Sequence, residues 1–140
     1  MILRVVLDTN IFISGIFWEG NYCSQIIDAW RRSKIKLVSS IEMVQELVET
    51  MRDFKIEMPT EMIEEWRKMI IENSIVVVPT EKMDIVKNDP SDNKFFEAAV
   101  IGKVEYIVSQ DKKHVLAIKE FRGVKTIHPE NFVKEILKDL

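Results

Sequence analysis

The sequence contains one cysteine, Cys23, and two histidines, His114 and His128. A single cysteine cannot form a disulfide within the chain, and this usage fits a reducing compartment, so we expect a cytoplasmic protein. The histidines lack the spacing of a zinc site and have no cysteine pair to join, which argues against zinc. The four glycines are too dispersed for a phosphate-binding loop or a dinucleotide fingerprint, which argues against a nucleotide cofactor.

The sequence also lacks long apolar runs. The longest stretches, such as residues 75–78, fall far short of the roughly 20 residues that a membrane span needs, so we expect a soluble protein with no membrane partner. The opening residues 1–4 lead directly into a predicted strand, which indicates an unprocessed chain. A length of 140 residues and a hydrophobic content of 46% predict one domain, residues 1–140, with a single core.

Basic charge is not in excess, since 20 basic residues stand against 23 acidic ones and the net charge is -3. The absence of a global basic field argues against a pure nucleic-acid-binding module. It argues less against a nuclease, because metal ions neutralise an acidic centre while a few lysines and arginines hold the phosphates.

Short apolar runs alternate with longer stretches of 3.6-residue periodicity, the pattern of a parallel sheet covered by helices. The predicted strands are residues 3–7, 35–38, 75–78, 104–108 and 124–127, and the predicted helices are residues 11–17, 24–32, 40–54, 60–73, 92–101 and 112–120, with a last helix opened by Pro129. Ser39 and Glu42 have the spacing of a capping box at the start of the third helix. The predicted fold class is α/β.

Two acidic residues stand where predicted strands end. Asp8 directly follows the first strand, and Asp111 follows the fourth within a few residues. Ligands bind at the carboxyl ends of the strands in such sheets, so the two carboxylates meet if these strands are neighbours. Carboxylates held together repel one another unless a cation lies between them, so their convergence predicts a divalent metal site. Taken singly, each could instead cap the helix that follows it.

Glu46 is the acid of the third helix that is best placed to turn inward. It lies near the border of the apolar arc, whereas Glu42 and Glu49 fall near the middle of the polar face. A solvated helical glutamate remains the alternative. An all-oxygen ligand set that includes Glu46 would suit Mg²⁺ or Mn²⁺.

Asp92 stands in the first turn of its helix, where any acid is favoured by the unpaired amides. It shares the face that carries Phe95 and Phe96, which are predicted to pack against the sheet, so its carboxylate should point toward the strand ends. Asp89 precedes Pro90 and is predicted to be a loop residue.

Three segments together resemble the PIN-domain family: residues 5–10 (VVLDTN), residues 89–99 (DPSDNKFFEAA) and residues 106–111 (YIVSQD). The first motif alone is weak, but all three in this order, with Glu46 between them, are fairly specific. The likeness extends from residue 3 to the strand at residue 124. It is greatest to prokaryotic PIN proteins that are toxins of toxin-antitoxin systems, akin to VapC.

The resemblance implies a three-layer fold with a parallel sheet of strand order 3-2-1-4-5 and helices on both faces. It implies that the catalytic and metal-binding residues are Asp8, Glu46, Asp92 and Asp111, that the ion is Mg²⁺ or Mn²⁺, and that Asn10 and Ser109 are polar supports. Candidate phosphate contacts are Lys112 and Lys113, and further candidates are Arg4 and Lys94. Some members carry a further acid where this chain has residues 112–114, a departure that weakens a two-metal site but not a one-metal site.

The function implied by the resemblance is a metal-dependent endoribonuclease that hydrolyses RNA phosphodiester bonds and is the toxin of a type II toxin-antitoxin pair. Its partners would be RNA, a cognate antitoxin and a second copy in a homodimer. One alternative is a non-catalytic PIN scaffold that binds RNA or protein. Another is a phosphohydrolase with Asp8 as nucleophile, although such enzymes usually place a second aspartate where this chain has Asn10.

Overall fold

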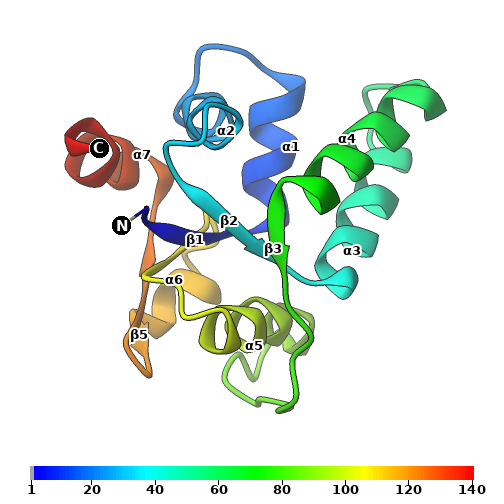
Figure 1. The fold of residues 1–140 in the computed structure, drawn as a ribbon. Helices are drawn as coiled ribbons and strands as arrows, with labels where there is room; N and C mark the ends of the chain where they lie inside the picture. Colours follow the sequence, from blue (N-terminus) through cyan, green and yellow to red (C-terminus); the bar gives the residue numbers. More distant parts are fainter. Residues whose placement is uncertain (1) are drawn as a thin grey trace.

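The structure is a computed structural model that describes residues 2–140, with a six-stranded sheet and helices on both of its faces (Figure 1). The strands are β1 (Arg4–Leu7), β2 (Lys36–Ser39), β3 (Ser74–Val76), β4 (Tyr106–Val108), β5 (Glu120–Phe121) and β6 (Val124–Ile127). The helices are α1 (Thr9–Phe17), α2 (Tyr22–Arg31), α3 (Ile41–Arg52), α4 (Thr60–Glu72), α5 (Asn93–Ile101), α6 (Val115–Ile118) and α7 (Pro129–Asn131). The remaining helical segments are the 3-10 helix η1 (Pro90–Asp92), the π-helical η2 (Phe132–Ile136) and the 3-10 helix η3 (Leu137–Asp139).

The strand order is β3-β2-β1-β4-β6-β5, and all neighbours are parallel except β5 and β6. The predicted order 3-2-1-4-5 is confirmed for the five parallel strands, because the predicted fifth strand is β6. The sheet is nevertheless mixed rather than purely parallel. The extra edge strand β5 pairs antiparallel with β6 across a turn in which Arg122 and Gly123 both have positive φ, the conformation that suits a two-residue hairpin.

The predicted helix over residues 112–120 is wrong in its extent. Only Val115–Ile118 is helical, and Lys119 then has a positive φ of 66°. The chain leaves the helix there because the next two residues pair with β6. Long-range pairing therefore overrides a local helical pattern, as it commonly does at sheet edges.

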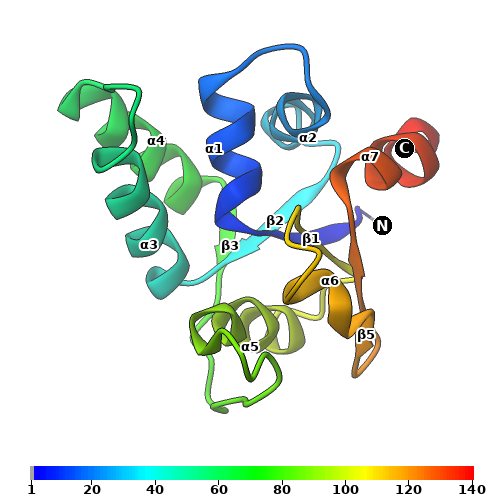
Figure 2. The same ribbon diagram turned by 180° about the vertical axis from the view of Figure 1, so that it is seen from behind.

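The central strand β1 packs against helices on both sides. Val5 and Leu7 belong to an apolar cluster formed with α1, α2 and α3, whereas Val6 belongs to a second cluster with α5. Figure 2 shows the same division from behind, with α1 and α2 on one side of the sheet and α5 and α6 on the other. The alternation follows from the two-residue period of a strand. Packing on both faces therefore fixes the carboxyl end of β1 between the two layers of helices.

The third helix begins one residue later than its capping-box pattern predicts. Ser40 is the N-cap of α3, and its hydroxyl accepts a hydrogen bond from the amide of Met43 at 3.3 Å. Ser39 is instead the last residue of β2, and its hydroxyl lies 2.8 Å from that of Ser74. The parallel pairing of β2 with β3 extends through Ser39, so the helix cannot start there.

In the described residues no helix has the length and apolar character of a membrane span.

Candidate metal centre

The pairing of β1 with β4 brings Asp8 next to Ser109. The amide of Asp8 donates to the carbonyl of Val108 at 3.0 Å, so the β1–β4 ladder continues one residue beyond the end of β1. The Ser109 hydroxyl, which is fully buried, donates to Asp8 Oδ2 at 2.6 Å. Within residues 2–140 the Asp8 side chain makes no hydrogen bond that caps α1. Asp8 thus occupies the N-cap position of α1, while its side-chain hydrogen bond is with Ser109.

Asp111 is held by the turn that follows β4. Its Oδ1 accepts hydrogen bonds from the amides of Lys113 at 3.1 Å and His114 at 3.0 Å, and its own amide donates to the Ser109 hydroxyl at 3.0 Å. Its Oδ2 lies 3.1 Å from Nδ1 of His114. Asp111 thus caps its turn, as weighed from the sequence, and also lines the same cleft as Asp8.

Glu46 is half-buried, while Glu42 and Glu49 are exposed, as the helical periodicity predicts. Both of its oxygens have partners: Oε2 accepts from the Thr9 hydroxyl at 2.8 Å, and Oε1 lies 3.1 Å from the ammonium of Lys94. Lys94 is only 6% exposed. Glu46 is close enough for its charge to act on Asp8, but it is tied to Lys94 rather than turned freely into the cleft.

Asp92 carries the least satisfied polar group of the centre. It closes η1 ahead of α5 and is 8% exposed. Its Oδ2 is buried and has no hydrogen-bond partner among residues 2–140. A buried carboxylate oxygen without a partner is costly, and in native proteins such a group commonly marks a place where an ion or water binds.

Asp89 and His114 also lie at this place, although the sequence does not predict them as site residues. One ring nitrogen of His114 and one carboxylate oxygen each of Asp89 and Asp92 lie within 4.8 Å of one another. The Ser91 hydroxyl donates to Asp89 at 2.6 Å and lowers the pKa of that carboxyl. The spacing of Asp89 and Asp92, three positions apart across a tight turn, is the signal that could have suggested the pair.

Two of the carboxyl groups have strongly raised pKa values. Burial raises the pKa of Asp8 to about 6, and the charges of Glu46 and Asp111 act in the same direction, against the hydrogen bond from Ser109. Burial likewise raises the pKa of Asp92 to about 7, with contributions from the charges of Asp8, Asp89 and Asp111. Buried carboxylates that repel one another are stabilised by a divalent cation, so the donor set fits the metal ion expected for this fold.

The carboxylates open into a cleft of about 440 Å³ that also has an aromatic part. Its lining consists of Asp8, Thr9, Asn10, Ile13, Ser14, Trp18, Thr50, Phe54, Asp89, Asp92 and Asp111. Trp18 is 43% exposed and packs edge-on against Phe54, with 5.9 Å between the ring centroids. The cleft therefore combines a set of carboxylates with an accessible aromatic surface.

The remaining candidates are the polar support Asn10 and the four cations that could contact phosphate. Asn10 accepts a hydrogen bond from the amide of Gln110 at 3.2 Å, which ties the segment after β1 to the segment after β4. Lys112 and Lys113 are exposed and directly follow Asp111. The other two candidates for phosphate contacts, Arg4 and Lys94, lie away from the cleft opening.

Arg4 begins β1 and therefore lies at the opposite, amino end of the strand. Its guanidinium donates to the carbonyl of Gly102 at 3.0 Å. Lys94 is buried in its ion pair with Glu46 and also donates to the carbonyl of Ser91. Neither cation is available to a phosphate in the cleft.

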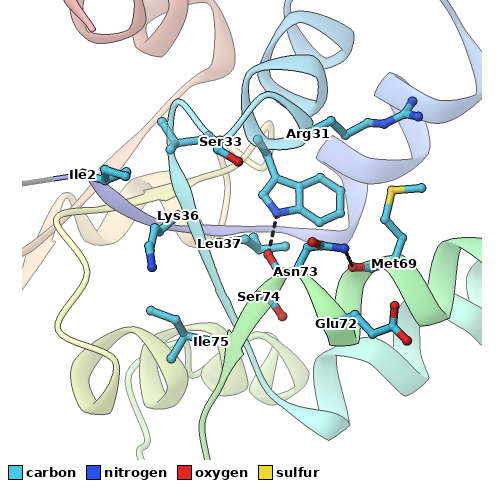
Figure 3. Close-up of a pocket in the computed structure, with 12 residues that line it drawn as sticks. Ile2, Arg31, Ser33, Lys36, Leu37, Met69, Glu72, Asn73, Ser74 and Ile75 are labelled. Atoms are coloured by element: carbon cyan, nitrogen blue, oxygen red, sulfur yellow. Dashed lines mark hydrogen bonds between the residues drawn. The ribbon is translucent and has the colours of Figure 1, made fainter.

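A second cavity, of about 370 Å³, lies at the amino ends of β2 and β3 (Figure 3). The indole of Trp30 donates to the carbonyl of Asn73 at 2.9 Å in its wall. In its described lining Glu72 is the one acid, beside the cations Arg31 and Lys36. This cavity has no cluster of carboxylates among the described residues, so the carboxyl ends of the strands are the better candidate for a metal centre.

A family model described as PIN domain matches residues 4–113, and the chain therefore belongs to the PIN-domain family. Solved structures show the same fold. A chain of FitAB bound to the IR36 DNA fragment has a TM-score of 0.57 at 14% identity, with 89% of this chain and 94% of that chain covered. A chain of VapBC2 from Rickettsia felis, bound to a DNA fragment from their promoter, has a TM-score of 0.61 at 12% identity, with 90% and 98% covered.

A chain of FitAcB from Neisseria gonorrhoeae is similar to the same degree, with a TM-score of 0.55 and 14% identity, and 90% and 98% of the two chains covered. Comparison with curated proteins gives no significant match. The similarity to solved structures is a similarity of fold, since the identities are low.

Proposed function

We propose that this protein is an endoribonuclease that depends on Mg²⁺ or Mn²⁺. The observation that carries the proposal is the unpartnered, buried carboxylate oxygen of Asp92, a residue that lines the same cleft as Asp8 and Asp111. Three acids that a protein holds together at the carboxyl ends of parallel strands destabilise it unless they bind a cation. This loss of stability in the metal-free protein is explained if the bound cation takes part in catalysis.

A divalent ion bound in this cleft would activate a water molecule and stabilise charge on the phosphate that is attacked. Asp8 and Asp92 would hold the ion, and Asp111 would line its approach. Ser109 fixes the orientation of Asp8 through its hydroxyl. Glu46 would act indirectly, because it contacts Thr9 and Lys94 and would position them beside the metal ligands.

The aromatic part of the cleft supports RNA as the substrate. Nucleobases stack on accessible aromatic rings, and each stacked base contributes about 1–3 kcal/mol of binding free energy. Trp18 and Phe54 line the cleft together with the carboxylates, and exposed Lys112 and Lys113 follow Asp111. A small phosphate monoester would have no use for this aromatic surface, so the arrangement favours a polynucleotide over the substrate of a phosphohydrolase.

We further propose that the protein is the toxin of a toxin-antitoxin pair and that it forms a homodimer in the cytoplasm. The proposal is supported by the fold of chains in FitAB and VapBC2, which this chain covers almost completely. The partner would be an antitoxin protein. Exposed apolar side chains at Ile41, Ile56 and Met62 offer surface for such contacts.

The test is the cleavage of a labelled, tRNA-containing RNA pool by purified protein with Mn²⁺ or with EDTA. Wild type should cleave only with metal, and Asp8→Asn should lose about 100-fold or more of the rate, because it removes a charged ligand. Asp84→Asn is the matched control, since Asp84 is exposed and lies outside the cleft. Equal cleavage by wild type and Asp8→Asn would refute the proposal, and a phosphorylated Asp8 would favour the phosphohydrolase.

A further inference from the structure

His114 is a part of the centre that neither the ligand set implied by the family resemblance nor the proposed function uses. It follows Asp111 by three positions, in the stretch where some relatives carry a further acid. The structure places its ring in a cluster with Asp89 and Asp92, whose potential ligand atoms all lie within 4.8 Å of one another. Three donors at that mutual distance can reach one ion.

The contact between His114 and Asp111 has the form that metal-binding histidines commonly show. A histidine that binds a metal through one ring nitrogen usually donates its other N–H to a carboxylate, which fixes the ring and its tautomer. Here Nδ1 lies 3.1 Å from Asp111 Oδ2. When Nδ1 donates to that carboxylate, the lone pair is on Nε2 and is available to a cation.

A second observation points to a ligand at the same place. Asp92 is more than nine-tenths buried, and its Oδ2 has no hydrogen-bond partner in the described part of the chain. If His114 served as the counter-cation of Asp92, a hydrogen bond from its ring to this oxygen would be expected. The ring instead pairs with Asp111, and the Asp92 oxygen is left for another partner.

We propose that Asp89, Asp92 and His114 form a metal site with two carboxylate ligands and one imidazole ligand, and that this site takes a divalent transition metal in preference to Mg²⁺. Mg²⁺ strongly prefers oxygen ligands, whereas imidazole nitrogen favours transition metals. The inference deepens the proposed function and rests on it for its biological use, because Asp92 is shared with the ligand set proposed above. The binding itself can be measured without RNA.

The experiment uses the metal-free full chain and Mn²⁺ as the probe. Calorimetry would give the affinities for Mn²⁺ and Mg²⁺, and pulsed electron paramagnetic resonance would detect coupling of bound Mn²⁺ to a ligand nitrogen. The variant is His114→Gln and its matched control is His128→Gln, since these are the two histidines of the chain. We expect about a 10- to 100-fold loss of Mn²⁺ affinity for His114→Gln and little change for the control.

The nitrogen coupling should be present in wild type and in His128→Gln and absent in His114→Gln. Mn²⁺ binding without nitrogen coupling would overturn the inference while leaving the proposed nuclease intact, and this readout on wild type needs no folded variant. An Mn²⁺ affinity that stays equal or rises in His114→Gln would identify the ring as a counter-cation and would also overturn it. Absence of Mn²⁺ binding at millimolar concentration would refute the site and the metal dependence together.

Discussion

The buried charge of Asp92 lowers the stability of the metal-free protein, and the same carboxylate is the proposed metal ligand. Its carboxylate is buried near three other acids and has an oxygen with no partner in the described residues. The replacement Asp92→Asn removes the charge and keeps the shape. We expect the metal-free melting temperature to rise by a few degrees, because an uncompensated buried charge is lost.

The same variant should lose the increase in melting temperature that Mn²⁺ gives to wild type, since a ligand that binds only the folded state stabilises it. Differential scanning calorimetry with and without metal measures both effects. Asp84→Asn, at an exposed position, should behave as wild type. A lower metal-free melting temperature for Asp92→Asn would mean that its charge already has a compensating partner.

The raised pKa values of Asp8 and Asp92 predict how the stability of the metal-free protein depends on pH. In the unfolded chain both groups titrate near 3.8, whereas in the folded protein they titrate near 6 and 7. The folded state therefore binds more protons between these values, and stability should fall as pH rises from about 4 to about 7 and then level off.

Urea unfolding at a series of pH values, compared between wild type and the double variant Asp8→Asn/Asp92→Asn, isolates this contribution. The difference in free energy of unfolding should grow in favour of the double variant by a few kcal/mol across the window. A difference that is independent of pH would show that the two carboxyls titrate normally.

At the scale of elements, Lys94 joins α5 and η1 to α3. Its ammonium pairs with Glu46 and also contacts the carbonyl of Ser91, while its stem is buried. The replacement Lys94→Met keeps the apolar stem but leaves Glu46 without its cation. Because the side chain of Glu46 is 32% exposed, water can take up part of the loss, and we expect a destabilisation on the order of 2 kcal/mol.

Denaturant unfolding of a double-mutant cycle measures this link. Adding Glu46→Gln to Lys94→Met should restore much of the lost stability, because no charge then remains unpaired. Strictly additive losses from the two substitutions would contradict a coupled ion pair.

The elements that the sequence could predict are those with a strong local pattern. The buried strands β1, β2 and β4 and the start of α4 after Pro59 follow from apolar runs and start signals. The strand β5 could not be predicted, because two residues carry no periodicity and their state depends on pairing with β6. The shift of the cap from Ser39 to Ser40 has a similar cause, since the β2–β3 ladder decides which serine is free to cap.

The candidate site was predictable where strand ends determine position and unpredictable where loops do. The carboxyl-end rule is enough to bring Asp8 and Asp111 to one edge once β1 and β4 are neighbours. Asp89 and His114 meet only because two separate loops approach each other, and no local pattern encodes that. The burial of Lys94 was likewise hidden, because a lysine in a first helical turn is usually exposed.

For the molecule as a whole, the proposed role as a toxin predicts a cellular effect that depends on the cleft. Induced expression in a bacterial host without a cognate antitoxin should arrest growth, and Asp8→Asn should relieve the arrest at equal protein level. The control Asp84→Asn should remain toxic. Toxicity that persists in Asp8→Asn would indicate an effect unrelated to the carboxylate cleft.

The proposed nuclease activity, the proposed metal site and the proposed role as a toxin all depend on a divalent ion being held at the carboxyl ends of β1 and β4. The most direct measurement is X-ray diffraction from crystals soaked in Mn²⁺, with anomalous data collected above the manganese absorption edge. We predict an anomalous peak at ligand distance from the Asp92 carboxylate and from at least one of Asp8, Asp89 and His114. A cleft without a peak at saturating Mn²⁺, or a peak elsewhere on the protein only, would contradict the metal centre.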